Sequence, residues 1–87
     1  MFDIQFTPRG KKDFEKLPRD IQKRIVIKMQ FFSSQQDPFL FSKPLVDLPP
    51  ATHRFRVGNY RIAFYTSEKT IIVDKIRHRS EIYKDST

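Results

Sequence analysis

The chain contains no cysteine among its 87 residues. Neither a disulfide framework nor a thiolate metal site can form, which excludes a zinc finger and suits a reducing cytoplasm. Long apolar runs are also missing. The opening MFDIQFTPRGKK has no signal-peptide core, and no stretch approaches the roughly 20 apolar residues of a membrane span. These absences predict a cytoplasmic chain with no membrane partner.

Acidic residues are scarce relative to basic ones. Ten Asp and Glu stand against seventeen Lys and Arg, and the net charge is +7. Such a surplus attracts polyanions before any contact forms, so nucleic acid or an acidic protein is the expected partner, with a solvated basic surface as the alternative. Hydrophobic residues make up 38% of the chain, which argues against disorder. The length predicts a single domain, residues 1–87, with one modest core.

Two helices are expected between an N-terminal strand and a set of later strands. Residues 2–7 alternate apolar and polar side chains, as a strand with one buried face does. Thr7 and Pro8 suit the start of a helix that ends near Leu17, and a second helix follows from Pro18. Its apolar stripe consists of Ile21, Ile25, Met29 and Phe32. Further strands are expected at residues 53–57, 60–66 and 70–77.

Four prolines interrupt the connection between residues 34 and 51. No regular element is expected to run through it, because each proline removes a backbone donor. Loops of this length in a small domain are usually functional or disordered. Here four apolar side chains predict packing against the core: Phe39, Phe41, Leu45 and Leu48.

The pair Gly58-Asn59 lies between two alternating runs and suits a two-residue hairpin turn. Residues across such a turn pair in order. The predicted pairs are Val57 with Tyr60, Arg56 with Arg61, Phe55 with Ile62, and Arg54 with Ala63. One face then carries Phe55, Val57, Tyr60, Ile62 and Phe64, and the helices cover it. The other face carries Arg54, Arg56 and Arg61.

Like charges directly across a strand pair destabilise it by some tenths of a kcal/mol to about 1 kcal/mol. An anion bound between the guanidinium groups would reverse that effect, and phosphate suits their forked donors. The arginine face therefore predicts phosphate binding. In the alternative, the three arginines extend into solvent or pair with acidic residues such as Asp74 and Asp47.

The loop at residues 67–69 predicts the register of the last strand. It places Asp74 opposite Arg61, where the carboxylate would hold the guanidinium, and it brings Ile76 and His78 to the arginine face. The closing stretch IRHRSEIYK adds further side chains near the same edge. These are Arg77, His78, Arg79 and Tyr83. Lys75 and Arg77 join Arg54 and Arg56 as candidate ligands of RNA phosphates.

Two segments, LVDLPPATHRFRVGNYRIAFY and IIVDKIRHRSEIYK, resemble the RelE/ParE superfamily of type II toxin–antitoxin toxins. One hallmark is an Arg-x-Arg-x-Gly-x-Tyr-Arg hairpin, here Arg54, Arg56, Gly58, Tyr60 and Arg61. The other is a closing His-Arg-x-x-x-Tyr, here His78, Arg79 and Tyr83. The resemblance covers nearly the whole chain. It implies the α+β RelE-like microbial RNase fold, β-α-α-β-β-β, with two N-terminal helices packed on one face of a mainly antiparallel sheet.

For the RelE branch, the resemblance implies an endoribonuclease that cleaves mRNA in the ribosomal A site without a metal or other cofactor. The ribose 2′-hydroxyl attacks the adjacent phosphate and leaves a 2′,3′-cyclic phosphate and a 5′-hydroxyl end. The ParE branch shares the fold, acts on DNA gyrase and lacks the RNase residues. A gyrase inhibitor of this kind, or a basic module that binds nucleic acid without cutting it, is the alternative. The joint presence of Arg61, His78, Arg79 and Tyr83 favours cleavage.

The resemblance also implies roles for single residues. Arg61 matches the arginine that stabilises the phosphate, and Arg54 and Arg56 match basic positions that are lysines in some members. Arginine keeps its proton, so neither of these two can act as a base. Tyr83 matches a tyrosine that orients the nucleophile or stacks on a base. Arg79 falls where the family places its general acid.

Four other titratable residues lie in or near these motifs. His78 suits proton transfer near neutral pH, and the alternative is a strand-end histidine bonded to the backbone. His53 starts the hairpin on the apolar face and is expected to be structural. Glu81 is a candidate base, and Glu68, in a turn, is expected to be solvated.

An antitoxin is the partner that the resemblance implies, with an acidic disordered segment that folds across the toxin. The net charge of +7 suits such a partner. The apolar surface near the proline-rich connection and the first helices is the expected docking site.

Overall fold

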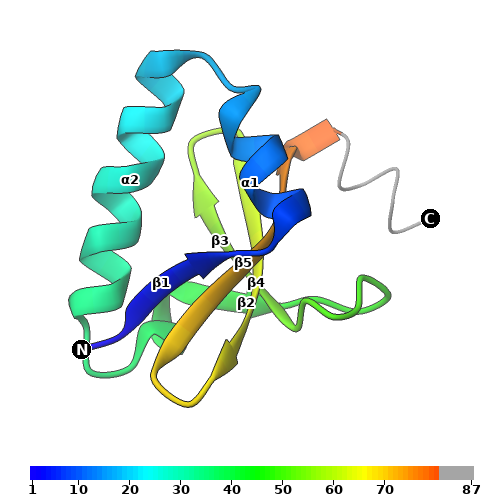
Figure 1. Ribbon diagram of the computed structural model, residues 1–87. Helices are drawn as coiled ribbons and strands as arrows, with labels where there is room; N and C mark the ends of the chain where they lie inside the picture. The colour runs from blue at the N-terminus through cyan, green and yellow to red at the C-terminus, as the bar shows by residue number, and fades with distance from the viewer. Residues whose placement is uncertain (81–87) are drawn as a thin grey trace.

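The computed structural model describes residues 1–80, which include two helices packed on a five-stranded sheet (Figure 1). The helices are α1 (Pro8–Glu15) and α2 (Arg19–Ser34), followed by a short 3-10 helix, η1 (Pro38–Phe41). The strands are β1 (Asp3–Phe6), β2 (Ser42–Pro44), β3 (His53–Val57), β4 (Tyr60–Ser67) and β5 (Thr70–His78). The predicted helices and strands therefore all form, with bounds shifted by at most two residues.

The sheet has the order β1-β5-β4-β3-β2, so the first strand of the chain lies beside the last (Figure 1). β1 runs parallel to β5, and the other neighbouring pairs are antiparallel. The expected mainly antiparallel α+β fold is confirmed. No helix within residues 1–80 combines the length and the apolar content that a bilayer crossing requires.

Helix α1 covers the edge of β5 beyond the end of β1. Thr7 caps the helix, since its side-chain oxygen accepts a hydrogen bond from the Gly10 N–H at 3.0 Å. Gly10 lies so close to β5 that a Cβ atom there would be 2.3 Å from the Val73 carbonyl oxygen. Asp13 accepts a hydrogen bond from the Ile76 N–H at 3.0 Å. This bond gives a partner to the backbone N–H of Ile76, which would otherwise be unpaired at this edge of the sheet.

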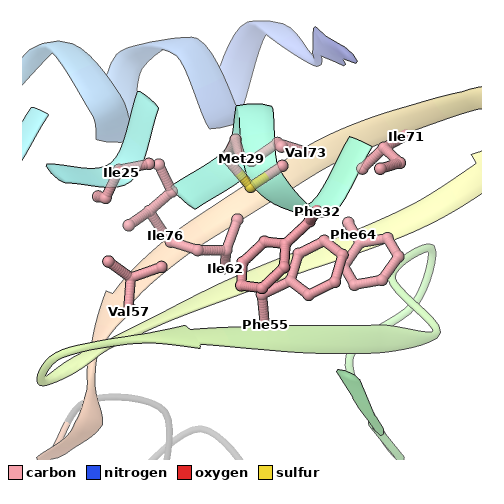
Figure 2. Packing of buried hydrophobic residues seen from close by; sticks show 10 residues of the cluster. All are labelled: Ile25, Met29, Phe32, Phe55, Val57, Ile62, Phe64, Ile71, Val73 and Ile76. Carbon is pink, nitrogen blue, oxygen red and sulfur yellow. The ribbon is translucent and has the colours of Figure 1, made fainter. Parts of the chain in front are cut away.

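Helix α2 lays its predicted apolar stripe on one face of the sheet (Figure 2). Ile25, Met29 and Phe32 are at most 6% exposed. Phe32 stacks on Phe55 with 4.1 Å between ring centroids, and Phe55 stacks on Phe64 at 4.2 Å. Full burial of one such side chain stabilises a fold by about 1.5–3 kcal/mol. The core cluster comprises Ile25, Met29, Phe32, Phe55, Val57, Ile62, Phe64, Ile71, Val73 and Ile76.

The proline-rich connection contains more regular structure than the sequence predicts. Asp37 caps η1 by accepting a hydrogen bond from the Phe39 N–H at 3.1 Å, and β2 then pairs antiparallel with β3. The expectation that no regular element runs here is wrong for residues 38–44, because Pro44 ends an edge strand where no neighbour needs its missing N–H. Phe39 packs against the core as expected, whereas 43% of Phe41 is exposed.

Candidate nucleic-acid interface

The hairpin of β3 and β4 has the predicted register. Gly58 has a φ of +59° at the first turn position, a conformation that glycine adopts without strain. The pairing sets Arg56 directly opposite Arg61 and Arg54 opposite Ala63. Because side chains alternate along a strand, the three arginines lie on the sheet face that α2 does not cover.

The register between β4 and β5 differs from the prediction. Arg61 lies opposite Arg77 rather than Asp74. A β-bulge leaves Asp74 without a partner in β4, and one extra residue turns every later side chain to the opposite face. The length of the turn alone does not reveal this bulge.

The bulge brings Lys75 and Arg77 onto the arginine face and turns their neighbours away from it. Ile76 is 5% exposed and belongs to the core. His78 lies opposite Tyr60 in the sheet, and the two rings are nearly perpendicular with 5.5 Å between centroids. The expectation that Ile76 and His78 lie beside the arginines is therefore wrong.

Six cationic side chains lie in two rows across this face. The first row crosses β3, β4 and β5 through Arg56, Arg61 and Arg77. The second row crosses β2 to β5 through Lys43, Arg54, Ala63 and Lys75. Like charges on neighbouring strands repel one another, so the face depends on counter-charges or solvent.

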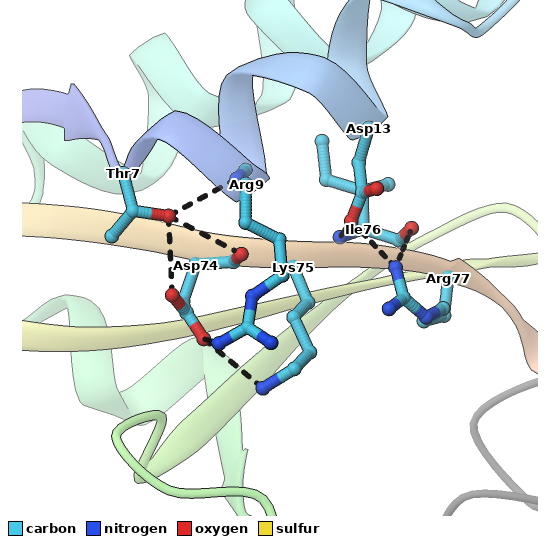
Figure 3. A network of polar contacts seen from close by, with 8 residues as sticks. Thr7, Arg9, Asp13, Asp74, Lys75, Ile76 and Arg77 are labelled. Carbon is cyan, nitrogen blue, oxygen red and sulfur yellow. Dashed lines mark hydrogen bonds and ion pairs between the residues drawn. The ribbon is translucent and has the colours of Figure 1, made fainter.

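Two of these cations have aspartate partners, and together they form the paired cluster: Lys75 with Asp74, and Arg77 with Asp13 (Figure 3). The Lys75 Nζ lies 3.1 Å from the Asp74 Oδ2, and the side chains are 9% and 4% exposed. Asp74 also accepts a hydrogen bond from the Thr7 hydroxyl at 3.1 Å. Helix α1 thus supplies Asp13 to this half of the face, and its cap Thr7 holds Asp74 in place.

The other four cations form the unpaired cluster: Lys43, Arg54, Arg56 and Arg61. Within residues 1–80, none of them forms an ion pair with a carboxylate. The alternative in which Asp74 neutralises the arginines is wrong, because its carboxylate pairs with Lys75 and, at 3.5 Å, with Arg9. Asp47 forms no ion pair in the described part of the chain either.

Arg61 lies in the central strand of this face and is 4% exposed. Its Nε and Nη1 atoms are buried, and neither has a hydrogen-bond partner among residues 1–80. An ionised group taken out of water without a partner is disfavoured by several kcal/mol. The position therefore favours an external anion that accepts hydrogen bonds from the guanidinium.

A recess of about 220 Å³ opens at the unpaired cluster. It is lined by Phe41, Lys43, Arg54, Arg56 and Arg61. Sites for drug-sized ligands are usually larger, roughly 300–1,000 Å³, so a small anion such as one phosphate group suits this recess better than a bulky ligand. Its arginines can stabilise negative charge, but they cannot accept a proton.

Of the remaining C-terminal candidates, Arg79 belongs to the described residues. Arg79 directly follows β5 and is exposed, and its N–H donates a hydrogen bond to the Asn59 carbonyl at 2.7 Å. Tyr83 and Glu81 lie outside the described residues. The structure thus places Arg79 near the hairpin turn.

His53 and Glu68 do not line the recess. The His53 ring packs 4.6 Å from the Phe39 ring on the apolar face, as expected of a structural histidine. Glu68 lies in the turn at the other end of β4, roughly 20 Å from Arg61 along the strand. Within residues 1–80, no three side chains among His, Cys, Asp and Glu gather closely enough to hold a metal ion.

Sequence reasoning missed Phe41 and Lys43 as members of the site. Phe41 ends η1 and Lys43 lies in β2. The spacing of two residues resembles that of a strand, but the surrounding prolines favour an irregular connection. Lys43 enters the site because β2 pairs it with Arg54.

The fold and the site define a small α+β protein with a strongly cationic sheet face. A family model described as the ParE toxin of the type II toxin-antitoxin system, parDE, matches residues 4–83. The chain belongs to this family, and with it to the RelE/ParE superfamily of toxins. A comparison with curated protein sequences finds no match.

Solved structures of toxin–antitoxin complexes share the fold. The RelBE2 complex from Mycobacterium tuberculosis is 26% identical with a TM-score of 0.71, over 90% of this chain and 98% of that chain. The RelB-RelE complex from Methanococcus jannaschii is 29% identical with a TM-score of 0.68, over 92% and 95%. A mutant of Escherichia coli toxin RelE with an antitoxin peptide is 16% identical with a TM-score of 0.66, over 99% and 94%. This last likeness concerns the fold alone.

Proposed function

We propose that this toxin is an endoribonuclease, an mRNA interferase that cleaves mRNA without a metal ion. The observation that carries the proposal is the buried guanidinium of Arg61 in a recess with three further cations. Negative charge grows on the phosphate oxygens when the 2′-hydroxyl attacks, and preorganised donors aimed at such charge are usually the largest contribution to catalysis. The similarity to RelE toxins supports the proposal.

In the proposed reaction, the ribose 2′-oxygen forms a bond to the adjacent phosphorus while the bond from phosphorus to the 5′-oxygen breaks. The 2′-hydroxyl loses a proton and the 5′-oxygen gains one, which gives a 2′,3′-cyclic phosphate and a 5′-hydroxyl end. Arg61 stabilises the charge on the non-bridging oxygens, and Arg54 and Arg56 hold the same or a neighbouring phosphate. Lys75 and Arg77 lie in β5 and extend the cationic face beyond the recess.

The arginines of the recess keep their protons, so proton transfer needs other groups. By resemblance, Tyr83 orients the attacking hydroxyl. Arg79 then lies beside the leaving oxygen and stabilises the charge that develops there before a proton arrives. We assign no part in the reaction to His78, because its ring packs against Tyr60 on the other face of the sheet.

Expression without an antitoxin, followed by mapping of mRNA ends, tests the activity. The wild-type chain should arrest growth and leave fragments with 5′-hydroxyl ends. Arg61→Gln should slow cleavage of ribosome-bound mRNA by about 10²–10³-fold, the usual effect of losing one transition-state donor. The double variant Tyr83→Phe, Arg61→Ala should abolish toxicity with the fold intact. Arg24→Gln removes the same charge from α2 and should cleave at the wild-type rate.

Inhibition of DNA gyrase is the second candidate, because the matching family model is described as ParE. Growth arrest that persists in the double variant, with gyrase inhibited and mRNA intact, would replace the RNase proposal. Intact mRNA, active gyrase and simple salt-dependent binding would instead indicate a basic module that binds nucleic acid without cutting it.

We also propose that an antitoxin neutralises this chain by laying an acidic amphipathic segment along α2. The antitoxin complexes of similar toxins support this class of partner. A groove of about 570 Å³ has an apolar floor, where Val26 and Ile27 are 42% and 65% exposed. Arg19 and Lys23 also line it. Apolar anchors with nearby cations suit a helix that has an apolar face and acidic neighbours.

Substitution in this groove tests the docking site. Val26→Asp should abolish co-purification with the cognate antitoxin, because the interface would bury an unpaired carboxylate. Val46→Asp, on the proline-rich connection and 73% exposed in wild type, is the matched control and should leave the complex intact. The reverse pattern would move the docking site to that connection.

A further inference from the structure

An aromatic side chain borders the unpaired cluster and has no part in the reaction above. Phe41 lines the recess with four cations, and 43% of it is exposed. A ring left partly in water forgoes the stabilisation that full burial would give. Its place beside the cations therefore points to a ligand that offers a flat apolar surface next to its negative charge.

The local structure holds this ring in place before a ligand binds. Phe41 ends η1, and both the N–H and the hydroxyl of Ser42 donate to the Phe39 carbonyl. The Phe41 ring lies 5.3 Å from that of Phe31 and 6.0 Å from that of Phe32, between centroids. Phe32 belongs to the core. The ring is thus supported by the core and open to the recess, which lowers the conformational entropy lost on binding.

The position of Phe41 also fits the spacing within a nucleotide chain. Lys43, two residues later, pairs with Arg54 across the sheet. Phe41 ends η1 directly before β2 and lines the recess together with Lys43 and Arg54. In RNA, every phosphate has a base within one nucleotide of it. A phosphate bound by Arg54 and Arg61 would therefore bring a neighbouring base to the edge of the recess where Phe41 lies.

We propose that Phe41 is a stacking platform for one base of the bound RNA, beside the phosphate held by the unpaired cluster. This inference rests on the proposed RNase function and adds a requirement for single-stranded RNA, because a base reaches the ring only when it has left its own stack. Stacking on an aromatic ring tolerates every base. Phe41 would therefore set affinity and register rather than the identity of the base.

Binding of a short single-stranded 2′-O-methyl RNA, which cannot be cleaved, tests the stacking. A matched set of oligonucleotides carries one abasic ribose at successive positions. With the wild-type chain, one of these positions should weaken binding by about tenfold, as expected for the loss of one stacked base. In Phe41→Leu, intact RNA should bind about tenfold more weakly, and the same abasic position should cause no further loss.

Two further variants separate stacking from a general change of shape. Phe41→Trp should restore both the affinity and the sensitivity to the abasic position. Leu40→Ala removes a neighbouring side chain that is 78% exposed and should bind like wild type. A Phe41→Leu variant that keeps the full abasic penalty would overturn the stacking role.

The same measurements distinguish failure of the stacking from failure of the proposed function. If the wild-type chain binds no RNA and mRNA stays intact in cells, both proposals are wrong. If it binds and cleaves RNA while Phe41→Leu keeps the abasic penalty, the stacking alone is wrong. If Phe41→Leu weakens the antitoxin complex and leaves RNA binding unchanged, the ring belongs to a protein interface instead.

Discussion

The two halves of the cationic face handle buried charge in opposite ways. In the paired cluster, Lys75 is 7% exposed and bound to Asp74, and Arg77 is bound to Asp13. In the unpaired cluster, Arg61 is 4% exposed and has no carboxylate partner within residues 1–80. The fold can supply a counter-charge to a buried cation, and it does so for one half only. The difference is the reason for proposing that phosphate binds at the unpaired cluster.

This contrast separates stability from function. Removal of a carboxylate from the paired cluster leaves a buried cation without a partner. Removal of the Arg61 guanidinium instead takes away a buried cation that has no carboxylate partner within residues 1–80. Substitutions in the two halves should therefore change the free energy of unfolding with opposite signs. A strained or unsatisfied group at a binding site is a common cost of activity.

The largest effect is expected for Asp74→Asn. The buried ammonium of Lys75 would lose its partner, and breaking a buried ion pair in this way lowers the free energy of unfolding by about 3–5 kcal/mol. Chemical denaturation followed by circular dichroism measures the change. Adding Lys75→Met should recover much of the loss, because no buried charge then lacks a partner.

Asp47→Asn is the control for that substitution, because Asp47 is exposed and asparagine tolerates its positive φ of 71°. It should change stability by less than about 0.5 kcal/mol. An equally small effect of Asp74→Asn would remove the distinction between the two clusters.

Gly10→Ala should weaken the contacts that Asp13, on α1, makes with the paired cluster. The new Cβ would lie 2.3 Å from the Val73 carbonyl oxygen, and α1 would have to move away from β5, taking Asp13 with it. Overpacking of this kind lowers the free energy of unfolding by about 1–3 kcal/mol, although alanine favours a helix by about 1 kcal/mol. Thermal unfolding measures the change. Lys11→Ala, at the exposed next position, should be close to neutral, and stabilisation by Gly10→Ala would contradict the packing argument.

Arg61→Met should act in the opposite direction and raise the free energy of unfolding by about 1–3 kcal/mol, the usual penalty of unsatisfied buried donors. Inorganic phosphate, compared with chloride at equal ionic strength, should raise the melting temperature of wild type and not that of the variant. Arg24→Met on α2 should respond to phosphate as wild type does. A destabilised Arg61→Met would mean that the guanidinium already contributes favourably to the folded chain, which would contradict the proposed anion site.

The hairpin could be predicted because its register is decided locally. Gly58 allows a tight turn, and the turn alone sets Arg56 opposite Arg61. The apolar stripe of α2 is equally local, since its spacing of three and four residues appears in any short window. These local patterns were enough to predict the fold and the arginines of the hairpin.

The register of β5 could not be predicted, because it depends on distant residues, although Lys75 and Arg77 are candidates from the sequence. The bulge at Asp74 is held by Thr7 and Arg9, which no local pattern near β5 reveals. Phe41 and Lys43 enter the site through a three-residue strand among prolines that predict none. Sequence periodicity therefore missed the contributions of the sheet edge and of α1.

The smallest expected effect is in the salt dependence of RNA binding. Each phosphate contact on single-stranded nucleic acid contributes a slope of about 0.7 to the fall of log K with log salt. Arg56→Gln, in the unpaired cluster, should reduce the slope by about 0.7. Arg9→Gln, whose side chain is 54% exposed and paired with Asp74, should leave the slope unchanged. Titration of an uncleavable RNA over a series of KCl concentrations measures both. Equal reductions of the slope in both variants would mean that RNA covers both halves of the face. The aspartates of the paired cluster would then be displaced when RNA binds.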